Sequence, residues 1–118
     1  MKGLIPAQEV LCIFCGRALE TIDHVLISCH LAWRLWCEAS QGWGVHLVFP
    51  GSLRSLFELW MDIRIGGKFM KKIWESIFYA VVWTIWKVRN NFILHGETVQ
   101  FDHILHLIKF RVGCWIQL

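Results

Sequence analysis

The sequence predicts a mainly α-helical fold, in which a small N-terminal knuckle at about residues 10–30 precedes a bundle of three to four helices. Three observations predict it. Three cysteines and one histidine lie within residues 12–29, apolar residues then recur at intervals of three and four, and Gly or Pro separates the apolar stretches. The length of 118 residues suits one domain with a single core.

Four helices are expected after the knuckle. Ser52 is a good N-cap for the second helix, and Gly66-Gly67 is expected to end it. Thr98 can cap the last helix. The longest stretch contains Val81-Val82, but 26 residues of helical spacing without Gly or Pro favour a helix over a strand. The expected ranges are about 30–39, 52–64, 69–94 and 98–116.

Each expected helix has an apolar face that predicts its buried side. The middle of the third helix is apolar almost all round, which is typical of a helix surrounded by others. Tryptophans spaced three apart fall on expected core faces, with either Trp33 or Trp36 buried, and core packing is favoured over base stacking for them and for Trp83 and Trp86. The other positions expected to be buried are Leu31, Leu35, Leu56, Leu59, Trp60, Ile63, Ile73, Ile77, Ala80, Val81, Ile85, Val88, Ile104, Leu107, Ile108 and Val112.

The composition indicates more apolar surface than a compact monomer of this length can bury. Apolar residues make up 56% of the chain and charged residues 18%, against about 45–50% and about 25% in ordinary soluble domains. The excess suggests that part of this surface meets a partner domain or another stretch of the same polypeptide. The formal net charge of +3 is a weak basic bias, which permits contact with phosphates without requiring it.

Cysteine number and the N-terminus bear on location. Five cysteines without a preceding signal peptide argue against a secreted disulfide framework, so reduced thiols and an intracellular setting, nuclear or cytoplasmic, are expected. The longest uncharged apolar run, Ser76 to Trp86, spans 11 residues, whereas a membrane span needs about 20. No membrane partner is therefore expected.

Four residues have the spacing of a metal site. Cys12, Cys15, His24 and Cys29 form the pattern C-x2-C-x8-H-x4-C. Three thiolates and one imidazole complete a tetrahedron around Zn²⁺ and leave no position for water, so the pattern predicts one structural zinc ion and no metal-based catalysis. Gly16 follows the second thiol, at a point where the backbone often needs a positive φ.

The interval between His24 and Cys29 restricts the local structure. On a regular α-helix, five residues leave the two side chains about 140° apart around the axis, so both cannot face one ion from the middle of a helix. We therefore expect a short helical turn from Thr21 to about Leu26, with Cys29 just beyond its end.

Other interpretations of the cysteines carry less weight. An isolated CxxC pair can be a redox motif, but that motif needs a βαβ setting, which this chain lacks. Buried cysteines without a ligand are the second alternative. Cys37 and Cys114 lie among helix residues and are expected to be core thiols, and His30 is the only substitute ligand.

Two blocks of sequence carry a family resemblance. The first runs from Gly3-Leu4-Ile5-Pro6 through Leu11-Cys12-x-x-Cys15-Gly16 and Glu20-Thr21-x-x-His24-Val25-Leu26-x-x-Cys29 to Trp36, and the second is Trp83-Thr84-Ile85-Trp86-Lys87-x-Arg89-Asn90-Asn91. Together they resemble the zinc-binding domain downstream of the reverse transcriptase in plant LINE-type (non-LTR) retrotransposons. The resemblance covers nearly the whole chain. It implies one reverse-transcriptase zinc-binding-type domain over residues 1–118, truncated at its N-terminus.

The resemblance implies a structural zinc-binding module of a retrotransposon-derived polyprotein, which assists the binding of RNA or DNA by a reverse transcriptase. Neighbouring reverse-transcriptase or ribonuclease-H-like domains are the implied protein partners, and no small-molecule substrate is expected. Asp23, Asp62 and Asp102 are scattered and form no polymerase cluster, so the chain is not expected to be an enzyme. Two alternatives stay open: a zinc-stabilised protein–protein interaction or scaffold domain, and a decayed fragment with no selected function.

Basic side chains interleaved with aromatic ones are the candidates for nucleic-acid contact, through phosphate pairing beside stacking platforms. One lies in the knuckle and the others lie on the expected third helix, where solvated charges near the ends of an apolar helix are the more ordinary interpretation. The candidates are Arg17, Lys71, Lys72, Lys87 and Arg89.

Overall fold

A computed structural model of the chain describes residues 10–116 and confirms the mainly helical fold. A π-helical turn, η1 (His24–Ser28), precedes four α-helices. These are α1 (His30–Gln41), α2 (Leu53–Asp62), α3 (Lys68–His95) and α4 (Phe101–Ile116). Within residues 10–116, no helix combines the length and apolar character that crossing a bilayer requires.

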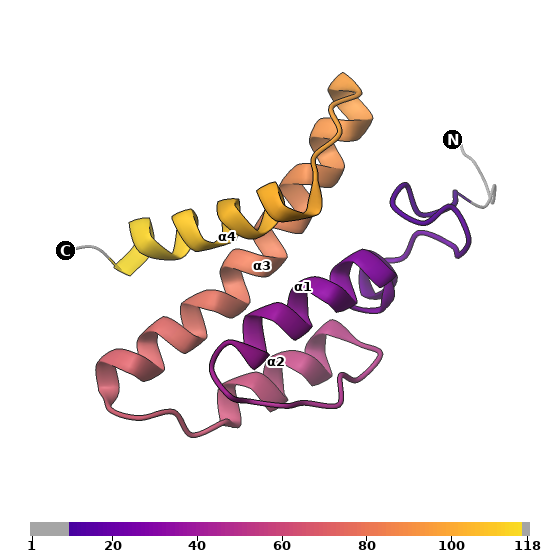
Figure 1. Ribbon diagram of the computed structural model, residues 1–118. Helices are drawn as coiled ribbons and strands as arrows, with labels where there is room; N and C mark the ends of the chain where they lie inside the picture. Colours follow the sequence, from indigo (N-terminus) through magenta and orange to yellow (C-terminus); the bar gives the residue numbers. More distant parts are fainter. Residues whose placement is uncertain (1–9, 117–118) are drawn as a thin grey trace.

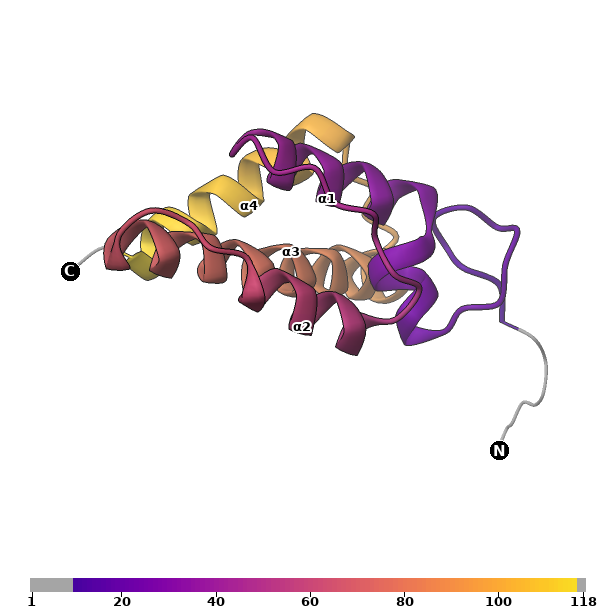
Figure 2. The same ribbon diagram turned by 90° about the horizontal axis from the view of Figure 1, so that it is seen from below.

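The long helix α3 is the central element of the bundle. In Figure 1, α4 crosses α3, while α1 and α2 lie alongside its first half. Figure 2 shows α1 and α4 over one side of α3, with α2 on another. The segment that carries the cysteines lies beside the start of α1, next to the second half of α3. One side of α3 is left without a covering helix among the described residues.

Three tryptophans with no exposed surface join α1, α2 and α3. The rings of Trp60 and Trp74 stack with centroids 4.0 Å apart and 4° between their planes. Each indole N–H donates to the backbone carbonyl of the other residue, at 2.8 and 2.9 Å. Trp36 packs edge-on against Trp60 at 5.3 Å and donates its indole N–H to the Leu26 carbonyl at 2.7 Å. The polar edges of three large rings are thereby satisfied inside the core, which makes their burial favourable.

Most positions expected to be buried are buried. Leu31, Ile63, Ile73 and Leu107 are only half-buried, and Leu59 is 36% exposed. The buried ones are Leu35, Trp36, Leu56, Trp60, Ile77, Ala80, Val81, Ile85, Val88, Ile104, Ile108 and Val112.

Either Trp33 or Trp36 is expected to be buried, and Trp36 is fully buried, whereas Trp33 is 48% exposed. The expectation of core packing is wrong for Trp83 and Trp86, which are 44% and 36% exposed. The expectation that α3 is surrounded by other helices is wrong for the same reason, because α1, α2 and α4 leave the side that carries Trp83 and Trp86 open. Apolar residues all round a helix predict burial, but the helices within residues 10–116 leave this side of α3 uncovered.

Two helix ends differ from the prediction, and one cap is confirmed. The Ser52 hydroxyl accepts a hydrogen bond from the Ser55 N–H at 3.1 Å, as an N-cap does. α2 ends at Asp62, before Gly66-Gly67, because the backbone becomes extended at Ile63. The amine of Lys71 holds this end by donating to the carbonyls of Met61 and Ile63 at 2.6 and 2.7 Å.

α4 begins at Phe101, three residues after the predicted cap, Thr98. The Gln100 carbonyl accepts from the Ile104 N–H at 3.0 Å, so the first helical hydrogen bond starts at Gln100. Val99 packs against the core in the segment between the two helices, which delays the start of α4.

Replacing Trp74 with Ala is expected to lower the free energy of unfolding by about 3–5 kcal/mol, because it empties a buried ring site and removes the hydrogen bond that the Trp74 indole donates to the Trp60 carbonyl. Trp83→Ala removes the same atoms from an exposed side chain and should cost about 1 kcal/mol or less. Urea unfolding followed by circular dichroism measures both. Equal losses at the two positions would contradict the assignment of the core.

Candidate metal centre

The four predicted ligands converge. The sulfur atoms of Cys12 and Cys29 are 3.7 Å apart, and the Cys15 sulfur lies 3.4 Å from Nε2 of His24. All four potential ligand atoms lie within 4.8 Å of one another. Cys12 and Cys29 are buried, whereas Cys15 and His24 are partly exposed. The cluster is therefore close enough to hold one metal ion, with its outer side toward solvent.

A short loop presents the first two thiols. An isolated antiparallel bridge pairs Leu11 with Leu19, and the Cys12 N–H donates to the Ala18 carbonyl at 2.9 Å. Gly16 has φ +66°, the left-handed conformation that was predicted for it, and its N–H donates to the Cys12 carbonyl at 2.7 Å. A side chain at this position would be strained. The loop thus turns both thiols toward the same point.

A π-helical turn brings His24 and Cys29 together. The Cys29 N–H donates to the His24 carbonyl at 2.7 Å, a bond that spans five residues and widens the turn. Cys29 then has extended backbone (φ −60°, ψ 143°) and precedes α1. The predicted helical turn with Cys29 beyond its end is confirmed, although it is wider than an α-helix and runs on to Ser28. Widening resolves the angular conflict of about 140° that a regular helix would create.

The environments of two thiols differ strongly. Hydrogen bonds from the backbone N–H groups of Arg17 and Ala18, helped by His24, lower the pKa of the Cys15 thiol to about 6. Burial raises the pKa of the Cys29 thiol to about 12, with a smaller contribution from Cys12. In the metal-free chain at neutral pH, Cys15 is a thiolate and Cys29 a thiol, so a bound cation must displace the proton of Cys29.

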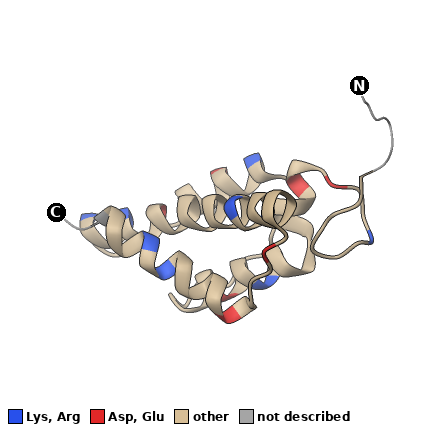
Figure 3. Cartoon of the chain, turned by 90° about the horizontal axis from the view of Figure 1, so that it is seen from above, with Lys and Arg blue, Asp and Glu red and all other residues tan. Residues whose placement is uncertain are grey.

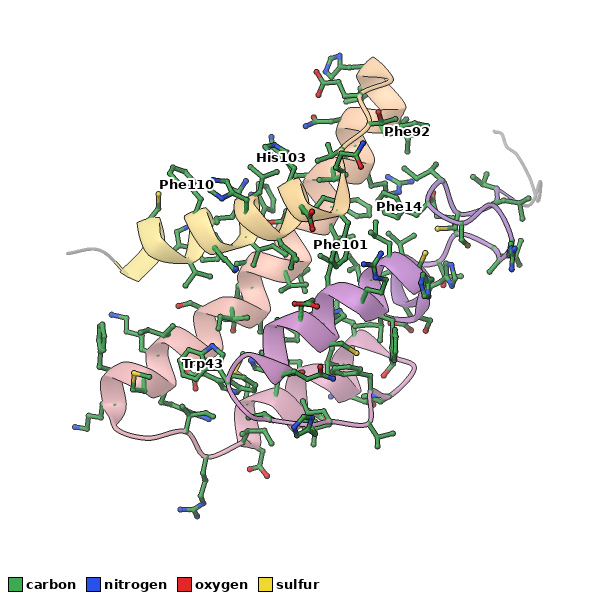
Figure 4. The ribbon with its side chains drawn as sticks, viewed as in Figure 1. Phe14, Trp43, Phe92, Phe101, His103 and Phe110 are labelled. Carbon is green, nitrogen blue, oxygen red and sulfur yellow. The ribbon has the colours of Figure 1, made fainter. Side chains whose placement is uncertain are left out.

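Hydrogen bonds fasten the cluster to the helices. The Thr21 hydroxyl accepts from the His24 N–H at 3.0 Å and begins the turn. The Asp23 carboxylate accepts from the Leu53 N–H at 2.8 Å, where a negative charge suits the N-terminus of α2. Phe14, between the first two ligands, lines a small cavity with Phe92 of α3, and Figure 4 labels both side chains.

An ion pair joins residues 10–23, called the metal loop here and the zinc loop where zinc is proposed, to α3. Nη2 of Arg89 donates to Oε1 of Glu20, and the two side chains are 18% and 8% exposed. The Arg89 guanidinium also lies over the Trp86 ring, 4.8 Å from its centroid, and donates from Nη1 to the Asn90 side chain at 3.0 Å. Glu20 belongs to the first sequence block, whereas Trp86, Arg89 and Asn90 belong to the second. The two blocks therefore meet in space.

The candidates for nucleic-acid contact fall into two groups. Lys71 is held by the carbonyls at the end of α2 and lies 3.8 Å from Glu75, and Arg89 is paired with Glu20, so both have structural partners. Arg17, Lys72 and Lys87 are exposed. Only the second group is free of salt bridges among the described residues.

The remaining cysteines and His30 lie outside the cluster. Cys37 is half-buried, and burial raises the pKa of its thiol. Cys114 is exposed, so the expectation that it is a core thiol is wrong: it lies on the outer side of the last turns of α4. His30 is exposed and stacks on Trp33 at 6.2 Å between centroids.

Sequence reasoning missed Glu20 and Asp23 as residues that position the cluster. Glu20 was visible as part of the first block, but its partner Arg89 is 69 residues away. Asp23 accepts a hydrogen bond from the Leu53 N–H, which lies 30 residues away in the sequence. No local spacing indicates either pairing.

A double-mutant cycle tests the ion pair between the metal loop and α3. Glu20→Gln and Arg89→Met are each expected to lower the free energy of unfolding by about 2–4 kcal/mol, since each leaves a nearly buried charge without its partner. Their coupling energy should be about 1–3 kcal/mol. The exposed pair Arg54–Glu58, 3.7 Å apart, is the control and should show coupling below about 0.5 kcal/mol. Strictly additive losses at Glu20 and Arg89 would contradict the pairing.

Comparisons of the chain with protein-family models, with curated proteins and with solved structures found no match. The family resemblance rests on the two sequence blocks, and residues 3–6 of the first block lie outside the described residues. The structure itself shows two things: the four candidate ligands converge, and the two blocks are in contact through Glu20 and Arg89.

Proposed function

We propose that Cys12, Cys15, His24 and Cys29 bind one structural zinc ion. Zinc–sulfur bonds of about 2.3 Å and zinc–nitrogen bonds of about 2.0–2.1 Å in a tetrahedron place two sulfurs about 3.8 Å apart and sulfur about 3.6 Å from nitrogen. The observed separations of 3.7 and 3.4 Å fit these values. A contraction of about 1 Å in the widest pairs completes the tetrahedron. Three sulfur donors and one imidazole are a ligand set typical of structural zinc.

The proposed role of the ion is to hold the N-terminal segment in its fold. Residues 10–23 contain little regular structure, and their apolar contacts are few, so bonds to a cation would supply most of their stability. Four protein ligands leave zinc no open position for a reactive water. We therefore propose a binding module and not an enzyme.

We further propose that the chain is a module of a retrotransposon-derived polyprotein that assists nucleic-acid binding by a reverse transcriptase. The observation that carries this proposal is the meeting of the two sequence blocks of the resemblance: Glu20 of the zinc-loop block pairs with Arg89 of the tryptophan-rich block. Residues of the two blocks are thus in direct contact within one structural unit. The basic net charge of +3 is compatible with phosphate contact.

A protein-interaction or scaffold module is the second candidate. Its support is apolar surface: Phe69 is 60% exposed, Leu94 72% and Phe110 65%. A groove bounded by Trp43, Ile73, Leu105 and Val112 adds to this surface. Figure 4 shows Trp43 beside the end of α1, on the side toward α3. Such surface is typical of chains that meet a neighbouring domain.

The zinc-loaded chain is expected to bind single-stranded RNA or DNA oligonucleotides, with an affinity that falls as salt rises. Each phosphate contact on a single strand contributes about −0.7 to the slope of log K against log salt, because neutralised phosphates release counterions. Fluorescence anisotropy at two salt concentrations measures the slope, and chelation of the metal should weaken binding. No binding, or binding indifferent to salt, would count against nucleic-acid contact and leave the scaffold function.

A further inference from the structure

Positive charge is concentrated in the last two helices. α3 and α4 together carry seven Lys and Arg and only two acidic residues, Glu75 and Asp102. The rest of the chain carries five Lys and Arg against seven acidic residues. Figure 3 shows basic segments along α4 and an acidic one near its start. The modest net charge of the whole chain therefore conceals a basic half, which suits an anionic partner.

An aromatic stripe runs along the open side of α3. It consists of Tyr79, Trp83 and Trp86, which are 51%, 44% and 36% exposed. Spacings of four and three residues place the three rings on one face of the helix. Arg89, held by Glu20, lies against the Trp86 ring, so the ion pair with the zinc loop fixes one end of the stripe.

Cations flank the middle of this stripe. Nζ of Lys87 and Cζ of Arg111 each lie 5.9 Å from the centroid of the Trp83 ring, one from α3 and one from α4. Neither is within salt-bridge distance of a carboxylate among the described residues. Glu75 is engaged with Lys71, and Asp102 is at the far end of α4 from Arg111. Figure 4 shows His103 and Phe110 pointing from α4 away from α1.

We propose that the aromatic stripe and its flanking cations, Lys87 and Arg111, form the surface that binds a single-stranded nucleic acid. This inference rests on the proposed function and locates it on α3 and α4, away from the zinc loop. Unpaired bases stack on the exposed rings, and their phosphates meet the two cations. The zinc loop acts on the surface indirectly, through Glu20, Arg89 and Trp86.

The charge of this surface favours a nucleic acid over a protein. Exposed Trp, Tyr and Arg are also common at protein interfaces, but there the core of the interface is depleted of unpaired charge. Here two unpaired cations border the central ring. In a duplex the bases are already paired and stacked. Its phosphates could contact the two cations, but its bases could not stack on the aromatic rings. Single strands use both parts of the surface.

Five variants of the zinc-loaded full chain test the location, with a fluorescent single-stranded RNA, the DNA of the same sequence, and the duplex of that DNA as probes. Trp83→Ala should weaken single-strand binding about ten-fold or more, as loss of a base stack does. Trp33→Ala is its matched control, because Trp33 is 48% exposed but lies on α1, and should change affinity less than about two-fold. Circular dichroism and zinc content check that each variant is folded.

The charge variants test Lys87, one of the two flanking cations. Lys87→Gln should reduce the salt slope by about 0.7, whereas Arg64→Gln, in the exposed segment between α2 and α3, should leave it unchanged. Arg17→Gln, in the zinc loop, should also leave the slope unchanged. Comparison of the affinities for the single-stranded RNA and for the single-stranded DNA of the same sequence shows which nucleic acid the chain prefers.

The outcomes separate the two proposals. Failure of the wild-type chain to bind any probe overturns both the nucleic-acid function and the surface. Binding that Arg17→Gln weakens, with Trp83→Ala and Lys87→Gln without effect, keeps the function and overturns the surface. Equal affinity for the duplex and the single strands, unaffected by Trp83→Ala, overturns the stacking role. Self-association of the chain that Trp83→Ala abolishes, without oligonucleotide binding, assigns the surface to a second copy and overturns the inference.

Discussion

The convergence of three sulfur atoms and one imidazole on a single point is the constraint on which the N-terminal segment depends. Residues 10–29 contain one isolated bridge and one π-helical turn, too little regular structure to hold two buried thiols in place. Burial raises the pKa of the Cys29 thiol to about 12, whereas hydrogen bonds lower the pKa of the Cys15 thiol to about 6, so these two ligands differ in how readily they lose the proton that a cation must displace. A divalent cation would replace this arrangement by four bonds. Its binding free energy then becomes folding free energy.

The metal loop is also a joint between helices far apart in sequence. Cys29 directly precedes α1, Asp23 caps the backbone at the start of α2, and Glu20 pairs with Arg89 of α3. Trp36 adds an indole hydrogen bond to the Leu26 carbonyl. A change at the four candidate ligands would thereby reach three helices, including α3.

Local chemistry was readable from the sequence, and tertiary partners were not. The ligand set, the positive φ of Gly16 and the Ser52 cap depend on a few adjacent residues, and each was predicted. The sequence predicts the end of α2 at about residue 64, before Gly66-Gly67, because the extended backbone at Ile63 has no local signal. The spacing of three residues between Trp83 and Trp86 predicts a core position for both, but their exposure depends on which sides of α3 other helices cover. The pair Glu20 and Arg89 joins residues 69 apart, which spacing cannot reveal.

X-ray absorption at the zinc edge of the purified chain tests the central claim most directly. One zinc per chain with three sulfurs at about 2.3 Å and one nitrogen at about 2.0–2.1 Å is the predicted first shell. Cys29→Ser should lower the metal content and unfold the N-terminal segment, whereas Cys114→Ser, an exposed thiol outside the cluster, should leave both unchanged. A chain that folds without metal, or a bound metal whose sulfur ligands survive the loss of Cys29, would contradict the account.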